Sequence, residues 1–325
     1  LDRLLPLLQQ CYARQLLQQD LHLGNFLLQG STLTVLDPAS CRRFGQASDQ
    51  QDNLALLLAQ LPFADWPLAL QKIAAVFPAT NSQALAQQAQ QLWRQRSRDY
   101  LQKIRRDCSD VADLGSDGLR ILCRRAALSD TLVARLRDPQ TLMAGATVLK
   151  NGNSAKVFLI EIDGRLLVVK QYINKDWVRT LRRAFRPSRA ARSWHYAHAL
   201  AFAGITVPAP VALVEQTVGP LVRSAWYISE FRHGRDLLAS WQERAPADGE
   251  LEAIHALFLL LQHCGISHGD MKATNLITDG EQIALIDYDG ASQHHRQKKL
   301  ARALAADKQR FLQNWPDNPA LQQRL

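Results

Sequence analysis

The chain has 325 residues, 47% of them hydrophobic and 21% charged, and a formal net charge of +9 at pH 7. This composition excludes a disordered or low-complexity chain and leaves room for about two domains. No apolar run approaches the roughly eighteen residues that a transmembrane helix needs. The cysteines are scattered and never spaced as CxxC, which indicates reduced, buried thiols in the cytoplasm: Cys11, Cys41, Cys108, Cys123 and Cys264.

The first third of the chain predicts a helix, a polar loop and a hairpin, followed by more helices. The loop is Asp20-Leu21-His22-Leu23-Gly24-Asn25, and Val35-Leu36-Asp37-Pro38 follows the hairpin. From Asn53 to Arg106, Leu and Ala recur at helical spacing, and the many Gln residues indicate solvated helix faces. Residues 107–130, with the turn Gly115-Ser116-Asp117-Gly118, are predicted to be a linker.

Three strands are predicted after a short helix at 131–137. Each run is apolar or alternating, and Gly-containing turns separate the runs, which cover 144–149, 155–162 and 166–172. A meander of three strands with a glycine turn between the first two is typical of the nucleotide-binding lobe of a kinase. We therefore expect a second domain at 131–325, with an N-lobe at about 131–230 and a C-lobe at about 231–325.

The third strand carries Val168-Val169-Lys170, where kinases keep the lysine that contacts the α- and β-phosphates. A lysine at the end of an apolar strand is often only an exposed edge residue, so this assignment depends on the motifs further along the chain. Only Gly152 is present where kinases have a glycine-rich loop. Phosphate binding would fall to backbone N–H groups around Gly152, Asn153 and Ser154.

Residues 177–203 are predicted to be largely helical and are basic. Kinases usually place on this helix a Glu that pairs with the strand lysine, but no Glu occurs between Glu161 and Glu215, so the pair is absent or made by another residue. Four arginines share a helix face: Arg179, Arg182, Arg183 and Arg186. Trp177, Leu181 and Phe185 are interleaved with the basic residues of this segment, which suits a surface that docks on anionic lipid headgroups. The alternatives are a solvated face without a partner and a nucleic-acid surface, although nothing resembles a nucleic-acid module.

Two further strands, at 211–214 and 225–228, lead into a segment that would join the lobes. Its residues are Ser229-Glu230-Phe231-Arg232, and the backbone of Glu230 and Phe231 would meet an adenine ring. An apolar helix at 254–261 then precedes the most informative motif in the chain.

That motif is His268-Gly269-Asp270-Met271-Lys272-Ala273-Thr274-Asn275, followed by Leu285-Ile286-Asp287-Tyr288-Asp289-Gly290. Phosphoryl transfer needs a carboxylate that orients and deprotonates the attacking hydroxyl, here Asp270, and oxygen ligands for Mg²⁺, here Asn275 and Asp287. Lys272 can neutralise charge on the transferring group. A predicted hairpin between the two halves brings Asn275 and Asp287 to the same rim. His268 is expected to hold the loop by hydrogen bonds.

The same pattern occurs twice, since Asp270, Asn275 and Asp287 lie 250 positions after Asp20, Asn25 and Asp37. This constant offset favours a duplicated domain. Gln18-Gln19 replaces His268-Gly269, and the nineteen residues before Asp20 cannot form a nucleotide-binding lobe. We therefore expect residues 1–106 to be a partial, degenerate kinase-like C-lobe. Because the chain begins at Leu1, we also expect it to be a fragment of a longer protein.

Residues 131–325 resemble the lipopolysaccharide core kinases, the heptose and Kdo kinases of Gram-negative bacteria. The motifs that carry the resemblance are those around Lys170, Asp270 and Asp287 and the Pro-rich turn at 207–211; Gly269 favours this branch over eukaryotic protein kinases. The resemblance implies an α+β, bilobal protein-kinase-like fold with a small antiparallel sheet and a helical C-lobe. It also implies ATP and Mg²⁺ as cosubstrates, and as acceptor a sugar hydroxyl of the lipopolysaccharide inner core at the cytoplasmic membrane.

Three other functions fit parts of the sequence. The missing helix Glu and the weak glycine loop suit a pseudokinase scaffold in lipopolysaccharide assembly. A kinase acting on a protein or another small molecule would keep the same catalytic residues without needing the basic helix. A nucleic-acid-binding module would use that helix and ignore ATP.

Overall fold

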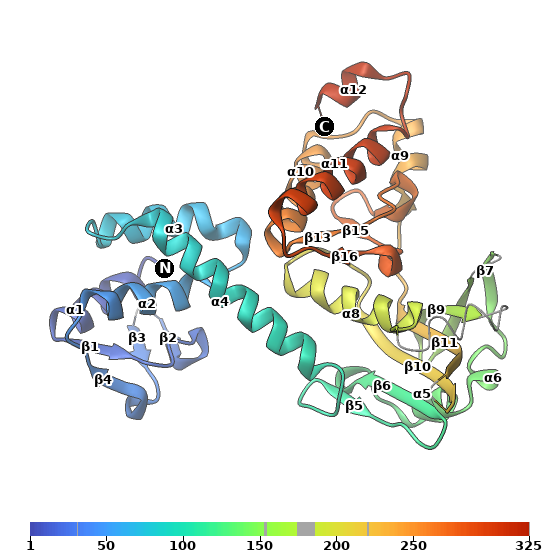
Figure 1. Cartoon of the computed structure of the whole chain (residues 1–325), viewed down its shortest axis with the longest axis horizontal. Coiled ribbons are helices and arrows are strands. Elements are labelled where there is room, and N and C mark those ends of the chain that lie inside the picture. Colours follow the sequence, from blue (N-terminus) through green and yellow to red (C-terminus); the bar gives the residue numbers. More distant parts are fainter. Residues whose placement is uncertain (31, 153–154, 174–185, 220, 325) are drawn as a thin grey trace. The chain divides into compact units, whose positions relative to one another are not determined.

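Figure 1 shows the computed structural model, which describes residues 1–30, 32–152, 155–173, 186–219 and 221–324. The chain forms two compact units, Leu1–Asp99 and Tyr100–Leu325. Among the described residues, no helix is long and apolar enough to cross a membrane. All five cysteines are free thiols, as expected, but only Cys123 and Cys264 are buried, and Cys41 is exposed.

The first unit combines helices with two short two-stranded sheets. Its core is formed by Leu side chains of the first two helices, with Ile73 and Leu85 from the helices that follow. The helices are α1 (Leu4–Ala13), α2 (Ala47–Leu58), α3 (Trp66–Val76) and α4 (Ser82–Lys103), and α4 continues into the second unit. Strand β1 (Leu16–Gln18) pairs with β4 (Cys41–Arg43), and β2 (Phe26–Gln29) pairs with β3 (Thr32–Val35).

The loop and hairpin of the first unit repeat local geometry of the second. Asp37 and Asp287 both adopt left-handed backbone conformations, with φ of 54° and 62°. The Asn25 amide donates to the Asp20 carbonyl at 2.9 Å, and the Asn275 amide donates to the Asp270 carbonyl at 2.8 Å. Gln18 Nε2 donates to the Leu36 carbonyl at 3.2 Å, where His268 Nε2 lies 3.0 Å from the Ile286 carbonyl.

A seven-stranded sheet dominates the N-terminal part of the second unit. All its neighbouring strands are antiparallel, in the order β5-β6-β10-β11-β9-β8-β7. The strands are β5 (Val111–Asp113), β6 (Leu119–Arg124), β7 (Thr147–Asn151), β8 (Lys156–Ile162), β9 (Arg165–Ile173), β10 (Pro210–Val218) and β11 (Leu221–Glu230). The predicted linker at 107–130 was therefore wrong for its central part, which extends the sheet.

One face of this sheet carries the core of the lobe and the other faces a helix. Helices α5 (Asp130–Arg137) and α6 (Pro139–Leu142) contribute Leu132, Leu136 and Leu142 to a core with side chains of β6, β8, β9, β10 and β11. Helix α8 (Arg189–Phe202) contacts β9, β10 and β11, and Figure 1 shows it lying along them. Burial of these apolar side chains fixes the sheet as a rigid platform for Lys170.

Helix α8 begins later than the sequence predicted. Arg186 lies in an exposed bend, and the helix starts after the Ser188 side chain, which accepts a hydrogen bond from the Ala191 N–H. Pro187 explains the boundary because it disfavours the helical conformation at the residue before it. Arg186 is therefore not on the predicted basic helix. Arg179, Arg182 and Arg183 lie outside the described residues.

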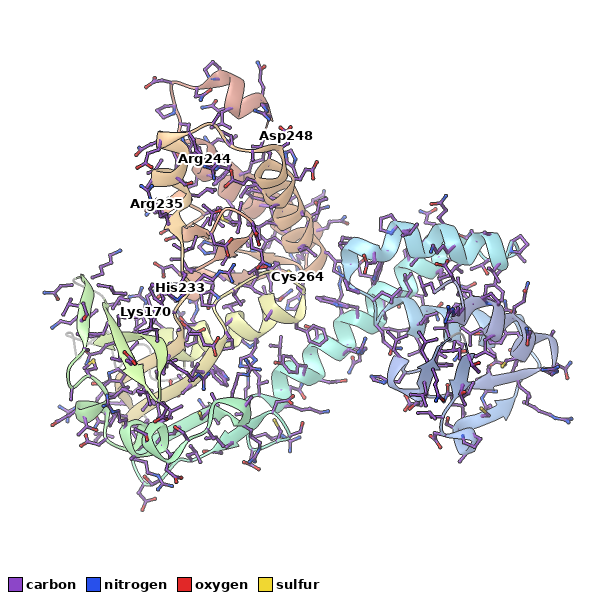
Figure 2. All side chains as sticks on the ribbon, turned by 180° about the vertical axis from the view of Figure 1, so that it is seen from behind. Lys170, His233, Arg235, Arg244, Asp248 and Cys264 are labelled. Carbon is purple, nitrogen blue, oxygen red and sulfur yellow. The ribbon has the colours of Figure 1, made fainter. Side chains whose placement is uncertain are left out.

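The C-terminal lobe is mainly helical and holds the predicted loop and hairpin. Buried Glu250 joins several of its elements, accepting hydrogen bonds from Trp241, Arg244 and Thr278. Arg244 is labelled in Figure 2 on this lobe. The helices are α9 (Leu237–Glu243), α10 (Asp248–Cys264), α11 (Gln297–Leu312) and α12 (Pro319–Arg324), and the strands are β12 (Arg235–Asp236), β13 (Ile266–Ser267), β14 (Leu276–Thr278), β15 (Ile283–Leu285) and β16 (Ser292–Gln293).

Candidate active site

The loop around Asp270 is held in place by backbone hydrogen bonds to buried side chains. Asp307, on α11 and only 3% exposed, accepts from the His268 N–H at 2.7 Å and the Gly269 N–H at 2.9 Å. The His268 ring, 1% exposed, lies 3.0 Å from the Ile286 carbonyl and accepts from the Asp270 N–H at 3.3 Å. As expected, His268 acts as a support for the loop.

Gly269 is required by the backbone of this loop. Its φ is +81°, and a Cβ atom at this position would lie 2.8 Å from the Gly290 carbonyl oxygen. Both the left-handed conformation and the close approach exclude a larger residue without movement. The loop that carries Asp270 therefore packs directly against the turn that follows Asp287.

The Asp270 carboxylate lies between two cations. Lys272 Nζ lies 3.1 Å from Oδ2, and Arg310 Nε, from α11, lies 2.6 Å from Oδ1. The contact with Arg310 is an ion pair without hydrogen-bond geometry. Oδ1 has almost no exposed surface and accepts no hydrogen bond from any described residue. Both carboxylate oxygens are thus paired with a cation, and an attacking hydroxyl would reach one of them only when that cation gives way.

A cavity of about 440 Å³ lies between the sheet and the hairpin of the helical lobe. This volume falls within the range of small-molecule sites. Its lining contains six of the residues predicted to bind nucleotide or metal: Gly152, Lys170, Glu230, Phe231, Asn275 and Asp287. Apolar side chains that would enclose a flat ring also line it: Val157, Val168, Ile277 and Ile286. Asn153 and Ser154 lie outside the described residues.

Lys170 and Asp287 form an ion pair inside this cavity. Lys170 projects from β9 and is labelled in Figure 2, and its ammonium donates to Asp287 Oδ1. Burial raises the pKa of Asp287, but the charge and hydrogen bond of Lys170 outweigh it, so the pKa lies below its usual range. The carboxylate is therefore ionised at neutral pH, as a metal ligand must be.

Where kinases usually have a Glu on this helix, α8 carries an arginine that pairs with a carboxylate of the C-terminal lobe. Arg189, in the first turn of α8, lies 2.6 Å from Asp289 Oδ2 and stacks over the Tyr172 ring at 4.8 Å. Arg192, one turn further, donates to the Ala291 carbonyl at 2.8 Å. Helix α8 is thus bound to the turn that contains Asp287, although it carries no carboxylate for Lys170 in its described residues.

Two tyrosines close the inner end of the cavity. Tyr227 and Tyr288 are both buried, their hydroxyls lie 2.9 Å apart, and burial raises the pKa of each well above its usual value. Both remain protonated, so the hydrogen bond between the two lobes persists at any physiological pH.

Two backbone N–H groups at the junction of the lobes already form hydrogen bonds within the N-terminal lobe. The Glu230 N–H donates to the Ala209 carbonyl and the Phe231 N–H to the Leu166 carbonyl, both at 2.9 Å. The N–H groups of Glu230 and Phe231 therefore already have acceptors within this lobe. Arg232 also lines the cavity.

The predicted cation ligands suit a hard divalent ion. The Asn275 amide nitrogen donates to the Asp270 carbonyl at 2.8 Å, so its oxygen is the remaining acceptor. Asp287 supplies a carboxylate oxygen in the same cavity. Mg²⁺ binds in this way, through one or two protein oxygens together with substrate phosphates and water.

Sequence reasoning missed three residues of the site: Arg189, Asp307 and Arg310. All three lie on helices whose distance from the motifs varies with loop length, so no fixed spacing identifies them. Asp307 offered the clearest signal, as a carboxylate among apolar residues of an amphipathic helix. Only the packing of α11 against the loop shows its role.

A small antiparallel sheet with a strand lysine, joined to a helical lobe with an Asp-x-Lys-x-x-Asn loop and a following Asp, is the protein-kinase-like fold. The model of the lipopolysaccharide kinase (Kdo/WaaP) family matches residues 145–319, just over half of the chain. The chain belongs to this family.

Two known proteins illustrate the similarity. The 3-deoxy-D-manno-octulosonic acid kinase of Vibrio parahaemolyticus serotype O3:K6 (strain RIMD 2210633) is 26% identical over 151 residues, which are 45% of this chain and 60% of that protein. The chain thus spans about 60% of the length of this curated relative. The solved structure of WaaP in complex with acyl carrier protein is 18% identical, with a TM-score of 0.40 over 60% of this chain and 93% of that chain.

Proposed function

We propose that the second unit is an ATP-dependent kinase that phosphorylates a sugar hydroxyl of the lipopolysaccharide inner core. Asp270 is the base, Lys272 neutralises charge on the transferring group, and Lys170 binds the α- and β-phosphates. Asn275 and Asp287 hold Mg²⁺, which supplies positive charge on the phosphates when bound. The observation that carries this proposal is the 440 Å³ cavity, because it gathers Lys170, Asn275 and Asp287 from three separate segments.

The acceptor proposal rests on the family and on its curated relative. The relative acts on 3-deoxy-D-manno-octulosonic acid, by its name, and Kdo is a sugar of the lipopolysaccharide core. The acceptor hydroxyl would give its proton to Asp270 while its oxygen bonds to the γ-phosphorus, and ADP leaves. Exposed Arg186, with Arg179, Arg182 and Arg183, would keep the protein near the anionic membrane surface that carries this acceptor.

The first unit is proposed to be a degenerate, partial copy of the kinase C-lobe with a structural role. Its support is the shared local geometry at Asp37 and Asp287 and the 250-residue offset between the two loops. Gln18 makes the hydrogen bond that His268 makes in the second unit. These features favour a loop that kept its fold although Gln18-Gln19 stands in place of His268-Gly269.

The test is transfer of labelled γ-phosphate from Mg-ATP by the full chain to lipopolysaccharide core lacking core phosphate, to bare sugars and to casein. Asp270→Asn should lower transfer by about 10²- to 10⁴-fold, since it removes the base, while nucleotide binding stays within about threefold. Asp117→Asn, an exposed carboxylate on the β5–β6 turn, is the matched control and should keep full activity.

Each other result would point to a different function. Label in casein alone would indicate a protein kinase. Nucleotide binding without label in any acceptor would support a pseudokinase scaffold. Retention of activity in Asp270→Asn would overturn the assignment of the base.

A further inference from the structure

A second cavity, of about 340 Å³, lies between the start of the Asp270 loop and α11. Small residues of the loop and of α11 form its walls, and the polar side chains of Gln309, Arg310 and Gln313 line it. Its volume is at the lower end of the range for small-molecule sites, so it has room for about one sugar residue.

The charge of this cavity is set by Arg310. Asp307 also lines it, but both its oxygens accept backbone hydrogen bonds, at 2.7 and 2.9 Å, and the side chain is buried. The Arg310 side chain is 48% exposed and is the cationic group among the lining residues. A guanidinium at the wall of a sugar-sized cavity favours a planar carboxylate, which it can bind through two parallel hydrogen bonds.

Arg310 also restricts the base. Asp270 Oδ1 has almost no exposed surface, and Arg310 Nε stands 2.6 Å from it without forming a hydrogen bond. An acceptor hydroxyl cannot reach this oxygen until the neighbouring group moves. The Arg310 side chain is 48% exposed, so it can turn toward an anion in the cavity when that anion replaces Asp270 as its partner.

We propose that Arg310 binds a carboxylate of the acceptor sugar in this second cavity and, in doing so, releases Asp270 Oδ1 to act as the base. This inference rests on the proposed kinase function. It predicts that the acceptor is a sugar acid whose carboxylate lies near the phosphorylated hydroxyl. A neutral sugar would leave Arg310 on Asp270 and would react slowly.

The experiment compares a 3-deoxyoctulosonic acid glycoside with its methyl ester, which lacks the negative charge and is larger by one methyl group, using the full chain and saturating Mg-ATP. Wild type should show a kcat/KM at least about tenfold higher for the acid, the scale of one charge-assisted hydrogen bond. Arg310→Gln should remove this preference, because it lowers kcat/KM for the acid and, by uncovering Asp270 Oδ1, raises it for the ester. Arg310→Lys should restore part of the preference. Arg302→Gln, an exposed arginine on the same helix, should behave as wild type.

The outcomes separate this inference from the kinase proposal. If wild type phosphorylates neither acceptor nor any core preparation, the kinase proposal itself fails. If wild type phosphorylates both equally, or if Arg310→Gln weakens acid and ester alike, the kinase stands and the role of Arg310 is overturned. If Arg310→Gln lowers kcat/KM only for a core sugar that carries a neighbouring phosphate, Arg310 binds a phosphate and the carboxylate assignment is overturned.

Discussion

The hydroxyl of Tyr100, at the end of α4, lies 2.7 Å from Nδ1 of His198 on α8. The His198 ring is 3% exposed and meets the edge of the Trp194 ring, whose Nε1 donates to the Ile104 carbonyl at 3.1 Å. Helix α8 is therefore bound on one side to the active-site turn and on the other to the segment that enters the second unit. A change in either contact should reach the site through this helix.

The buried histidine predicts a specific pH dependence of stability. Burial lowers the pKa of His198 to about 3, and the charges of Arg124 and His195 add to the shift. Below the ordinary histidine pKa of about 6.5, the unfolded chain binds a proton that the native state does not. The stability is therefore complete above about pH 6.5 and is lost, at roughly 1.4 kcal/mol per pH unit, as the pH falls toward the folded pKa.

The measurement is urea unfolding followed by tryptophan fluorescence at several pH values from 7 to 4.5. His198→Gln should reduce the slope of the unfolding free energy against pH relative to wild type. Exposed His233, labelled in Figure 2, provides the control, and His233→Gln should keep the wild-type slope. Equal slopes in wild type and His198→Gln would show that His198 does not titrate between the two states.

The backbone conformation of Gly269 predicts that adding one methyl group there lowers both activity and stability. Gly269→Ala combines a left-handed φ with a contact of 2.8 Å to Gly290, so the Asp270 loop must move away from the turn that follows Asp287. We expect kcat to fall at least about tenfold and the melting temperature to drop, since left-handed strain alone costs about 1–2 kcal/mol.

Gly249→Ala is the matched control for this change. Gly249 lies in the first turn of α10, and its Cβ would meet open space, so the variant should be as stable as wild type or up to about 1 kcal/mol more stable. Full activity in Gly269→Ala would show that the loop tolerates the displacement.

Removing the Asp307 carboxylate should destabilise the protein, and a conservative substitution there should destabilise it less. Asp307→Ala leaves the N–H groups of His268 and Gly269 without their acceptor in a buried position, at a cost of about 2–4 kcal/mol. Asp307→Asn retains one acceptor oxygen and should cost less. Asp317→Ala, an exposed carboxylate in the same lobe, should stay within about 0.5 kcal/mol of wild type in urea unfolding.

Arg189 predicts a defect in catalysis that spares nucleotide affinity. Arg189→Met would leave the buried Asp289 carboxylate without the guanidinium that lies 2.6 Å from it and would loosen α8 from the Asp287 turn. We expect kcat to fall about tenfold or more, with the KM for ATP changed less than threefold. Arg223→Met, an exposed arginine on β11, should leave both constants unchanged.

A double-mutant cycle with Asp289→Asn tests whether this effect belongs to the pair. If Arg189 acts through Asp289, the two substitutions together should reduce kcat little more than either alone. Fully additive losses would assign Arg189 a separate function.

The site residues that could be predicted from the sequence are those whose chemistry requires a fixed spacing along the chain. Asp270, Lys272 and Asn275 lie within one loop, and a short hairpin places Asp287 beside them, so the sequence alone indicated their proximity. Arg310 reaches the same carboxylate from α11, and nothing in the local sequence separates it from the other basic residues of that helix. Its place depends on tertiary packing, which periodicity does not describe.

The error at 107–130 has a similar physical origin. Gly115-Ser116-Asp117-Gly118 is a turn signal, and a turn between two paired strands and a turn in an open linker require the same residues. Here it closes the hairpin of β5 and β6, with Gly118 at a φ of +74°. The flanking runs are short, and only the pairing of β6 with β10 shows that they belong to the sheet.

Helix α11 begins at Gln297, and only His294, His295 and Arg296 separate it from the two-residue strand β16, which pairs with β13. Protein kinases commonly use a long segment at this point as an on–off control that responds to covalent modification. The short connection leaves little chain on which such a control could act.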